Sequence, residues 1–457
     1  MTDNIIDFSP IAARMPRNPS KWDIIPVHSS DRATFKFCRR QWVWSSPSHL
    51  NLIKKASILG INDALWFGTG IHKALERYYN PAIRDDPAIA WEAWFDLQWR
   101  GGEIGADEVK EFADRDPRQI TETTENGEQR FTGLYKVAGL VDILPDAYRD
   151  EEKYLGFREL GIGMMNFFKD WSEENDNFAV ILVEHDFSVP VLNKKGEPLY
   201  AVDHRLMPDG WEPDLDAGNE FGPLMREIRL PHDVNPAAIV IEKQVHVRGR
   251  QDLIIQEHES GRYGIRDWKT TSRLTNDYFR HLELDEQCTS YLGFGQLEAR
   301  LHNLEFKELE FIDYVAILKS YPKPPTALKD GTPSLARSTE TTTAKMFEQY
   351  IDSNGLRPLF EMDVKMQNYY SWLLELGDDR FIKTTRTWRN HTQRLNAMIR
   401  LHAEAIDMLS PNMVPYPNPT KNYSCLNCMF RIPCIQAETG DDYTLTLSDG
   451  YMPNWDR

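Results

Sequence analysis

Two aspartates and one lysine in the middle of the chain have the residue types and spacing that metal-assisted phosphodiester cleavage requires. Asp252 lies in one strand-like segment, and Asp267 and Lys269 lie in the next, beyond a turn near Gly261. Side chains two residues apart in a strand project from one face, so Asp252 can lie beside the other two across the hairpin. Carboxylates bind hard divalent ions, which polarise a phosphoryl oxygen and lower the pKa of an attacking water. The lysine can orient or help to deprotonate that water, or stabilise developing charge.

An Asp-x-Lys sequence alone has a simpler explanation, because Asp–Lys pairs are commonly surface ion pairs of little energetic effect. The wider pattern favours a functional site. Residues 247–272 contain G-R-x-D, a gap of 14 residues and then D-W-K-T-T. Two further motifs flank this segment in the sequence, G-x-x-x-H at Gly68 to His72 and Q-x-x-x-Y at Gln287 to Tyr291.

These four motifs, in this order, resemble the nuclease core of the PD-(D/E)XK superfamily, and specifically its RecB-like branch. The resemblance covers about residues 38–434. It implies a metal-dependent DNA nuclease with His72, Asp252 and Asp267 as metal ligands, joined by the backbone carbonyl of Trp268. It also implies that Lys269 is the catalytic lysine. Mg²⁺ or Mn²⁺ is the expected ion, and a histidine ligand favours the softer Mn²⁺.

Three more residues are candidates for the same site. Gln287 and Tyr291 are four apart and share one helix face. The resemblance implies that they contact the DNA backbone or support the lysine, while the alternative is an ordinary buried tyrosine with a surface amide. Glu184 matches a glutamate that this branch often carries near the end of its first strand, so we include it as a candidate residue of the metal site.

The five cysteines form a second pattern. Cys425 and Cys428 make a C-x-x-C pair, Cys434 follows, and Cys38 is the natural fourth ligand of a tetrahedral site. The arrangement resembles the iron–sulfur nucleases of the RecB-like branch, including the CRISPR-adaptation-associated exonuclease family, and so implies a structural 4Fe-4S cluster. Zinc is the alternative, because four cysteines also bind it readily. Cys288 is expected to be a buried thiol.

The elements that position these residues follow from hydrophobic periodicity. Helices are expected over residues 31–45, 67–79, 155–171, 284–301 and 384–408, and strands over residues 178–192, 238–256, 263–269 and 306–318. This order predicts an α/β fold with a mostly helical N-terminal extension. The resemblance makes the core a restriction-endonuclease-like mixed sheet flanked by helices, with a C-terminal cysteine-rich clasp.

The chain divides into five expected segments, which differ in composition. They are a flexible lead-in (1–30), a helical region with the first cluster cysteine and the histidine motif (31–176), the nuclease core (177–320), a lid or helical region (321–410) and an iron–sulfur tail (411–457). Two acidic stretches, residues 101–128 and 193–233, are expected to be exposed insertions.

The bulk composition limits location and partners. The chain has 457 residues and no apolar run long enough to span a membrane, and its first residues do not form a secretory signal, so a cytoplasmic location is expected. Its net charge of −17 counts against a simple nucleic-acid binder, although a groove can be locally basic on an acidic body. Aromatic and basic residues interleave over residues 35–44, which is typical either of a single-strand grip or of a half-buried helix.

The expected function is that of a DNA exonuclease or end-processing nuclease acting on linear or single-stranded ends. One alternative is a catalytically idle DNA-binding or assembly subunit with the same fold. Another is an endonuclease, or a component of a larger complex whose motor is a separate protein, since the chain lacks a Walker-type phosphate loop. Recombination or replication partners and a phage origin are further expectations.

Overall fold

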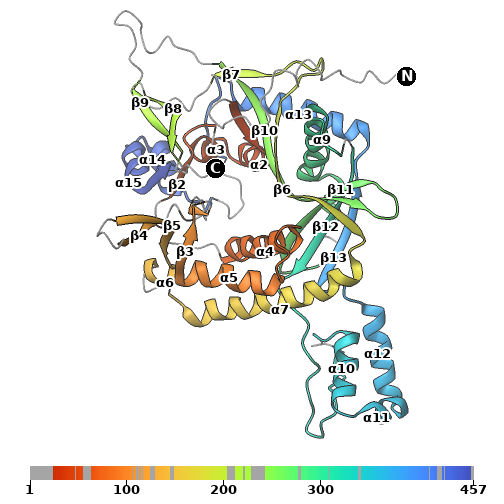
Figure 1. Cartoon of the computed structure of the whole chain (residues 1–457). Helices are drawn as coiled ribbons and strands as arrows, with labels where there is room; N and C mark the ends of the chain where they lie inside the picture. Colours follow the sequence, from red (N-terminus) through yellow and green to blue (C-terminus); the bar gives the residue numbers. More distant parts are fainter. Residues whose placement is uncertain are drawn as a thin grey trace, which may run out of the picture.

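Within the part of the chain that the computed structural model describes, seven strands form one mixed sheet at the centre of the molecule (Figure 1). Its path runs through β1 (Ile24–His28), β10 (Glu242–Glu257), β11 (Tyr263–Thr271), β12 (Leu309–Leu318) and β13 (Ile382–Trp388). Off this path, β10 also pairs with β6 (Phe178–Pro190) and β7 (Tyr200–Val202). The β1–β10 and β11–β12 pairs are parallel, and the others are antiparallel.

The structure describes most of the chain, with gaps. The described residues are 24–46, 48–54, 63–106, 108–109, 112, 115, 117–123, 129–144, 149–202, 211–219, 222–227, 242–275, 279–306, 308–337, 341–410, 412–418, 425–426 and 428–453. Most of the expected lead-in, residues 1–23, lies outside this set.

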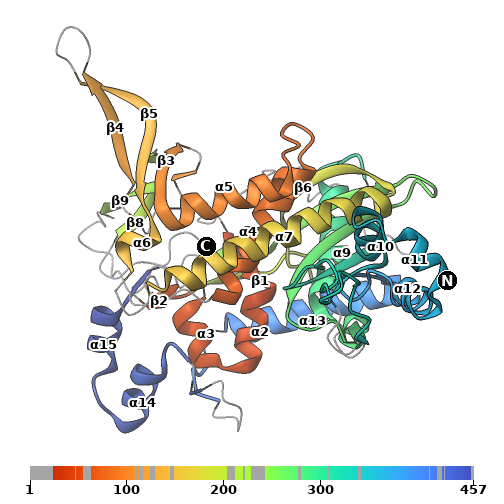
Figure 2. The same ribbon diagram turned by 90° about the horizontal axis from the view of Figure 1, so that it is seen from below.

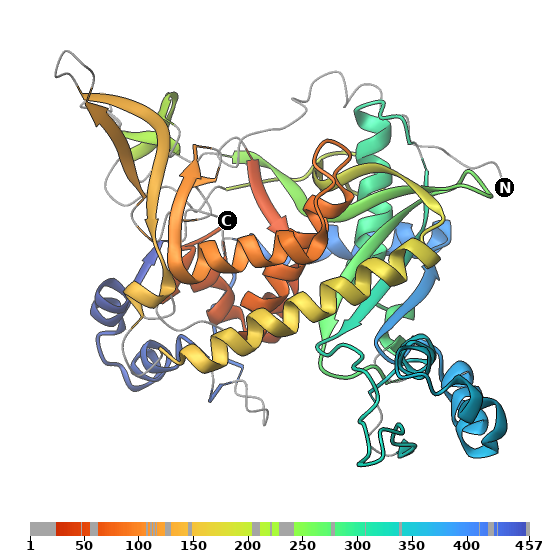
Figure 3. The same cartoon turned by 60° about the horizontal axis from the view of Figure 1, so that its bottom comes forward.

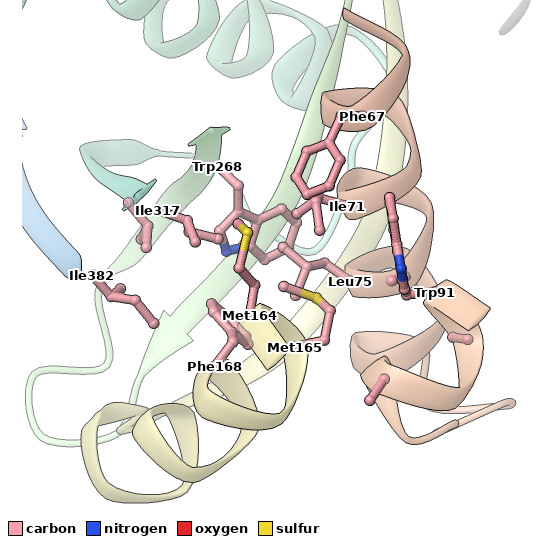
Figure 4. Packing of buried hydrophobic residues seen from close by; sticks show 14 of the residues in the cluster. Phe67, Ile71, Leu75, Trp91, Met164, Met165, Phe168, Trp268, Ile317 and Ile382 are labelled. Atoms are coloured by element: carbon pink, nitrogen blue, oxygen red, sulfur yellow. The ribbon is translucent and has the colours of Figure 1, made fainter. Parts of the chain in front are cut away.

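Helices cover both faces of the sheet (Figures 1 and 2). On one face lie α4 (Asp63–Tyr79), α5 (Pro87–Arg100) and α7 (Glu151–Asn175), and on the other lie α9 (Glu286–Leu301) and α13 (His391–Met408). Figure 4 shows the first interface, where the buried Trp268 of β11 meets Ile71 and Leu75 of α4 and Phe168 of α7. The expected α/β class, with a mixed sheet flanked by helices, is therefore confirmed.

Smaller elements surround this core. A three-stranded sheet of β3 (Gly101–Gly105), β5 (Gln129–Ala138) and β4 (Arg118–Thr123) projects from one end (Figure 2), and α6 (Leu140–Ile143) follows it. A helical module of α10 (Ala344–Ser353), α11 (Arg357–Met362) and α12 (Val364–Leu376) stands apart from the sheet (Figures 1 and 3). The remaining short elements are β8 (Trp211–Asn219) paired with β9 (Gly222–Glu227), β2 (Leu52–Lys54) paired with β14 (Tyr451–Pro453), η5 (His281–Glu283), α14 (Arg431–Thr439) and α15 (Tyr443–Gly450).

Two expected elements near the N-terminus are corrected. Residues 24–28 belong to the sheet and not to a lead-in, because β1 is buried and pairs in parallel with β10. The helix expected over residues 31–45 is two helices, α2 (Ser29–Phe37) and α3 (Arg39–Ser45). The break falls at Cys38, whose extended backbone caps α3 while its sulfur accepts a hydrogen bond from the Gln41 N–H.

The helix expected over residues 384–408 is also wrong in its first part. Residues 382–388 form strand β13 on the edge of the sheet, and α13 begins only at His391. The sequence I-K-T-T-R-T-W is rich in β-branched and aromatic residues, which favour a strand. The tail after residue 411 contains two helices, α14 and α15.

Candidate active site

The site begins where two strands of the sheet separate. The β10–β11 pairing runs from Gln256↔Tyr263 to Leu253↔Arg266 and ends there, and Asp252 is the next residue on β10. Its carboxylate accepts a hydrogen bond from the Trp268 N–H at 2.9 Å, in place of a further strand pair. The carboxylate is therefore held in the gap between the strands.

Asp267 and Lys269 lie together on one face of β11, as the spacing predicted. The Lys269 Nζ is 2.7 Å from Asp267 Oδ2. The other carboxylate oxygen of Asp267, Oδ1, is buried and has no hydrogen-bond partner among the described residues. Burying a carboxylate oxygen without a partner destabilises the folded state, and a bound cation would offset this loss of free energy.

His72 reaches the same place from helix α4. Its Nδ1 lies 3.4 Å from Asp252 Oδ2. The helix can approach the sheet closely because Gly68 lies against β11, where an added Cβ would sit 3.3 Å from the Thr270 hydroxyl. The glycine of the G-x-x-x-H motif thus packs against the threonine of the D-x-K-T motif.

Glu184 completes the group from strand β6, where it lies across from Asp252, between the pairs Gln251↔His185 and Leu253↔Val183. Its φ of +48° is rare for a residue with a side chain and stores backbone strain, a feature common at functional sites. His72, Glu184 and Asp252 each offer one ligand atom, and these three atoms all lie within 4.8 Å of one another.

This donor set fits a hard divalent ion. Two carboxylates and one imidazole suit Mg²⁺ or Mn²⁺, and the unpaired Asp267 Oδ1 is a further oxygen in the same region. Asp267 is not part of this three-residue group, and its other oxygen, Oδ2, pairs with Lys269. Its expected role as a ligand stays a prediction, as does that of the Trp268 carbonyl.

Burial and crowded charges shift the pKa values of these groups. Burial, with repulsion from Asp252 and Glu76, raises the pKa of Glu184 to about 7. Burial also raises the pKa of Asp267, which attraction to Lys269 offsets only in part. For His72, burial lowers the pKa, but the Asp252 charge and hydrogen bond outweigh it and the net pKa is raised. A divalent ion that binds at neutral pH must therefore displace protons.

Opposite effects act on the other two charged groups. Burial would raise the pKa of Asp252, but the charges of His72 and Lys269 and the backbone hydrogen bond from Trp268 lower it overall. Burial would lower the pKa of Lys269, but the two aspartates raise it well above its usual range. At neutral pH the lysine is an ammonium ion that can donate hydrogen bonds but cannot accept a proton.

Helix α9 brings Gln287 and Tyr291 to the same region. The Gln287 side-chain amide donates to the Tyr291 hydroxyl at 3.0 Å. Burial, with repulsion from Asp267, raises the pKa of Tyr291 to about 12. Gly249 makes room for this ring, since an added Cβ would lie 3.4 Å from Tyr291 and 2.6 Å from Phe187. The tyrosine therefore stays protonated beside the site, and contact with DNA stays a prediction.

The four clasp cysteines gather at the junction of the chain's two ends. Burial raises the pKa of Cys428, and the thiols of Cys38, Cys434 and Cys425 raise it further, which places all four in one neighbourhood. Arg40 donates to Cys434 Sγ at 3.6 Å. Among the described residues, no three of these sulfurs lie within 4.8 Å of one another.

The fifth cysteine, Cys288, is separate. It is buried in the apolar core beneath α9, and burial raises its pKa. This placement agrees with the expected buried thiol.

The buried aromatic residues of 35–44 and two arginines, Arg386 and Arg389, are held by contacts within the fold. Trp42 and Phe35 are buried in the core, which supports the half-buried-helix interpretation of residues 35–44. Arg386 pairs with Asp313 through two bonds of 2.7 and 2.8 Å, and the buried Arg389 donates to the Thr289 hydroxyl. These arginines stabilise the fold.

Three charged residues beside the site were not singled out from the sequence as parts of it. Arg250 lies two residues before Asp252 and forms two hydrogen bonds of 2.7 and 3.0 Å with Asp186. Glu76 lies one helical turn after His72 and acts on Glu184. The G-R-x-D motif contains Arg250, but nothing in the sequence indicates its partner on β6.

A mixed sheet carrying a histidine, carboxylates and a lysine at one break between strands defines a metal-dependent nuclease. The family comparison agrees, because the family model for the PD-(D/E)XK nuclease superfamily matches residues 29–434. The chain belongs to this superfamily. No curated protein matches the sequence with significance. Among the described residues, no helix has both the length and the apolar character needed to cross a bilayer.

Proposed function

We propose that this chain is a DNA exonuclease or end-processing nuclease of the RecB-like branch, with an iron–sulfur cluster held by its cysteine clasp. The observation that carries the nuclease proposal is the convergence of His72, Glu184 and Asp252, with Lys269 on the adjacent strand. The assignments to the RecB-like branch, to exonuclease activity and to an iron–sulfur protein rest on the motif order in the sequence and on the placement of the cysteines.

Each residue of the site has a distinct task. A divalent ion held by His72, Glu184 and Asp252 supplies polarisation of the phosphoryl oxygen and a lowered water pKa. The Trp268 N–H fixes the Asp252 carboxylate in the gap between the strands. The Lys269 ammonium, held by Asp267, donates hydrogen bonds to the phosphate and stabilises the negative charge that develops there.

The resemblance of the cysteine pattern to the iron–sulfur nucleases favours a four-iron cluster over zinc, which four cysteines also bind readily. The cluster's proposed role is structural, because it joins residue 38 to residues 425–434.

The test compares linear DNA with a covalently closed circle of the same sequence, in Mn²⁺ or in EDTA. An exonuclease degrades the linear form only, and only with the metal. Asp267→Asn is expected to lose activity on the order of 10³-fold, because it releases the lysine and removes a charge from the site.

Two outcomes would favour the rival assignments. Equal degradation of the circle would replace the exonuclease with an endonuclease. DNA binding without metal-dependent cleavage would indicate an idle binding subunit. Recombination or replication partners, a phage origin and a cytoplasmic location stay predictions.

A further inference from the structure

The strand that carries Asp252 also carries two arginines on the same face. Arg250 lies opposite Asp186 of β6, and Arg248 lies opposite Ser188. Residues two apart in a strand project from one face and are separated by about 6.6 Å. The two guanidinium groups therefore form a short positive row that begins beside the metal site and leads away from it along β10.

Arg250 is exposed, and in the free protein it is paired with a carboxylate. Its guanidinium makes two hydrogen bonds, of 2.7 and 3.0 Å, to the two oxygens of Asp186, and Nη1 is 3.5 Å from Glu184 Oε2. The Arg250 and Asp186 side chains are 53% and 57% exposed. An exposed ion pair adds little to the stability of the fold, so stability alone does not account for this pair. The two-oxygen geometry is also that in which arginine binds phosphate.

Arg248 is a cation that Asp186 attracts but that pairs with no carboxylate among the described residues. No hydrogen bond or ion pair joins its side chain to another described residue, although it is half-buried. Burial, which outweighs attraction to Asp186, lowers its pKa. A half-buried guanidinium beside a second guanidinium is electrostatically unfavourable, and an anion bound to each of them would reduce this repulsion.

We propose that Arg250 and Arg248 bind successive backbone phosphates of the DNA strand, and that Asp186 is an internal competitor which holds Arg250 until a phosphate displaces it. The inference rests on the proposed nuclease function and deepens it by naming the substrate-binding residues. It also offers a way for a chain of net charge −17 to bind a polyanion, since Arg250 is paired with a carboxylate in the free protein and is released only when a phosphate binds. Removing Asp186 should therefore strengthen DNA binding.

The test measures binding of a short fluorescein-labelled single-stranded DNA to the full-length protein by fluorescence anisotropy in EDTA, where cleavage is blocked. Arg250→Gln is expected to weaken binding roughly tenfold, the loss of one charge-assisted contact. It should also reduce the slope of log K against log salt concentration by about 0.7. Arg248→Gln should act in the same direction.

Asp186→Asn should tighten binding several-fold, because asparagine keeps the shape of the side chain and releases the arginine. The double variant Asp186→Asn/Arg250→Gln should bind like Arg250→Gln alone. Arg262→Gln is the matched control, since Arg262 is 51% exposed and also pairs with a carboxylate, Glu310, at 3.6 Å. Its binding should equal that of the wild type.

A purely structural pair gives a different pattern. If Asp186→Asn weakens binding as Arg250→Gln does, or if neither changes it, the proposal is overturned. A thermal melt of each variant shows whether the fold persists, and an exposed pair predicts little change. If the wild type cleaves DNA but the arginine variants bind DNA normally, only the proposed phosphate binding by Arg250 and Arg248 is wrong. If the wild type neither binds nor cleaves DNA, the proposed function fails with it.

Discussion

Replacing Lys269 with methionine is expected to abolish DNA cleavage while leaving Mn²⁺ binding intact. The ammonium group lies 2.7 Å from Asp267 and is held in its charged form by two aspartates. Methionine keeps most of the side-chain volume and removes the charge. The loss of one preorganised charged donor at the reacting phosphate predicts a fall in kcat on the order of 10³-fold.

Metal binding should respond differently, because a positive charge leaves the site and Asp267 is freed from its partner. The affinity for Mn²⁺, measured by calorimetric titration, is therefore expected to stay the same or rise. The matched control is Lys169→Met, which removes an ion pair of the same 2.7 Å length, to Asp86, away from the site. This control should keep wild-type kcat. Cleavage at the wild-type rate by Lys269→Met would remove the lysine from the mechanism.

Replacing Cys38 with serine is expected to have the second-largest effect, on the whole fold. This cysteine is the N-terminal ligand of the proposed cluster, and the other three lie at residues 425–434. Loss of this ligand removes a cross-link that closes a loop of nearly the whole chain. By analogy with a disulfide of that span, the free energy of unfolding is expected to fall by about 5 kcal/mol. The variant should lose iron, lose its visible absorption and melt at a lower temperature.

The same substitution should also slow cleavage, because the clasp is linked to the active site through helix α2. Arg32 of that helix is almost fully buried and its guanidinium lies 3.3 Å from Glu286, the neighbour of Gln287. Lys36 of the same helix pairs with Glu286 at 2.7 Å. Loss of the clasp frees the end of α2 and with it the start of α9.

Cys288→Ala is the control for this prediction, since Cys288 is buried away from the clasp. It should keep its iron and its absorption spectrum. Wild-type protein that is colourless and contains zinc would overturn the cluster, and full iron content in Cys38→Ser would exclude Cys38 as a ligand.

The sequence predicted the parts of the site that are local in the chain. The spacing of Asp267 and Lys269 is enough to place both on one strand face, and the structure pairs them. The glycines of two motifs proved to be required by close packing, at Gly68 against Thr270 and at Gly249 against Phe187. These contacts join distant segments, so the motifs indicated a common site without showing its geometry.

Other features depend on contacts that no local pattern contains. Strand β1 pairs with residues more than 200 positions later, and its short sequence with Pro26 has no alternation to reveal it. Residues 384–388 were expected to begin a helix, whereas they lie in an edge strand where Arg386 is fixed by Asp313 on the neighbouring strand. The ion pair between Asp186 and Arg250 is equally non-local, so the sequence did not indicate that Arg250 belongs to the site.

In the proposed active site, His72, Glu184 and Asp252 hold a divalent ion beside Lys269. The most direct measurement is the anomalous scattering of Mn²⁺ in crystals of the full-length protein grown with that ion. We expect a manganese peak within roughly 2.0–2.4 Å of the imidazole nitrogen and of both carboxylates. Crystals with ordered density for these three side chains and no manganese peak between them would contradict it.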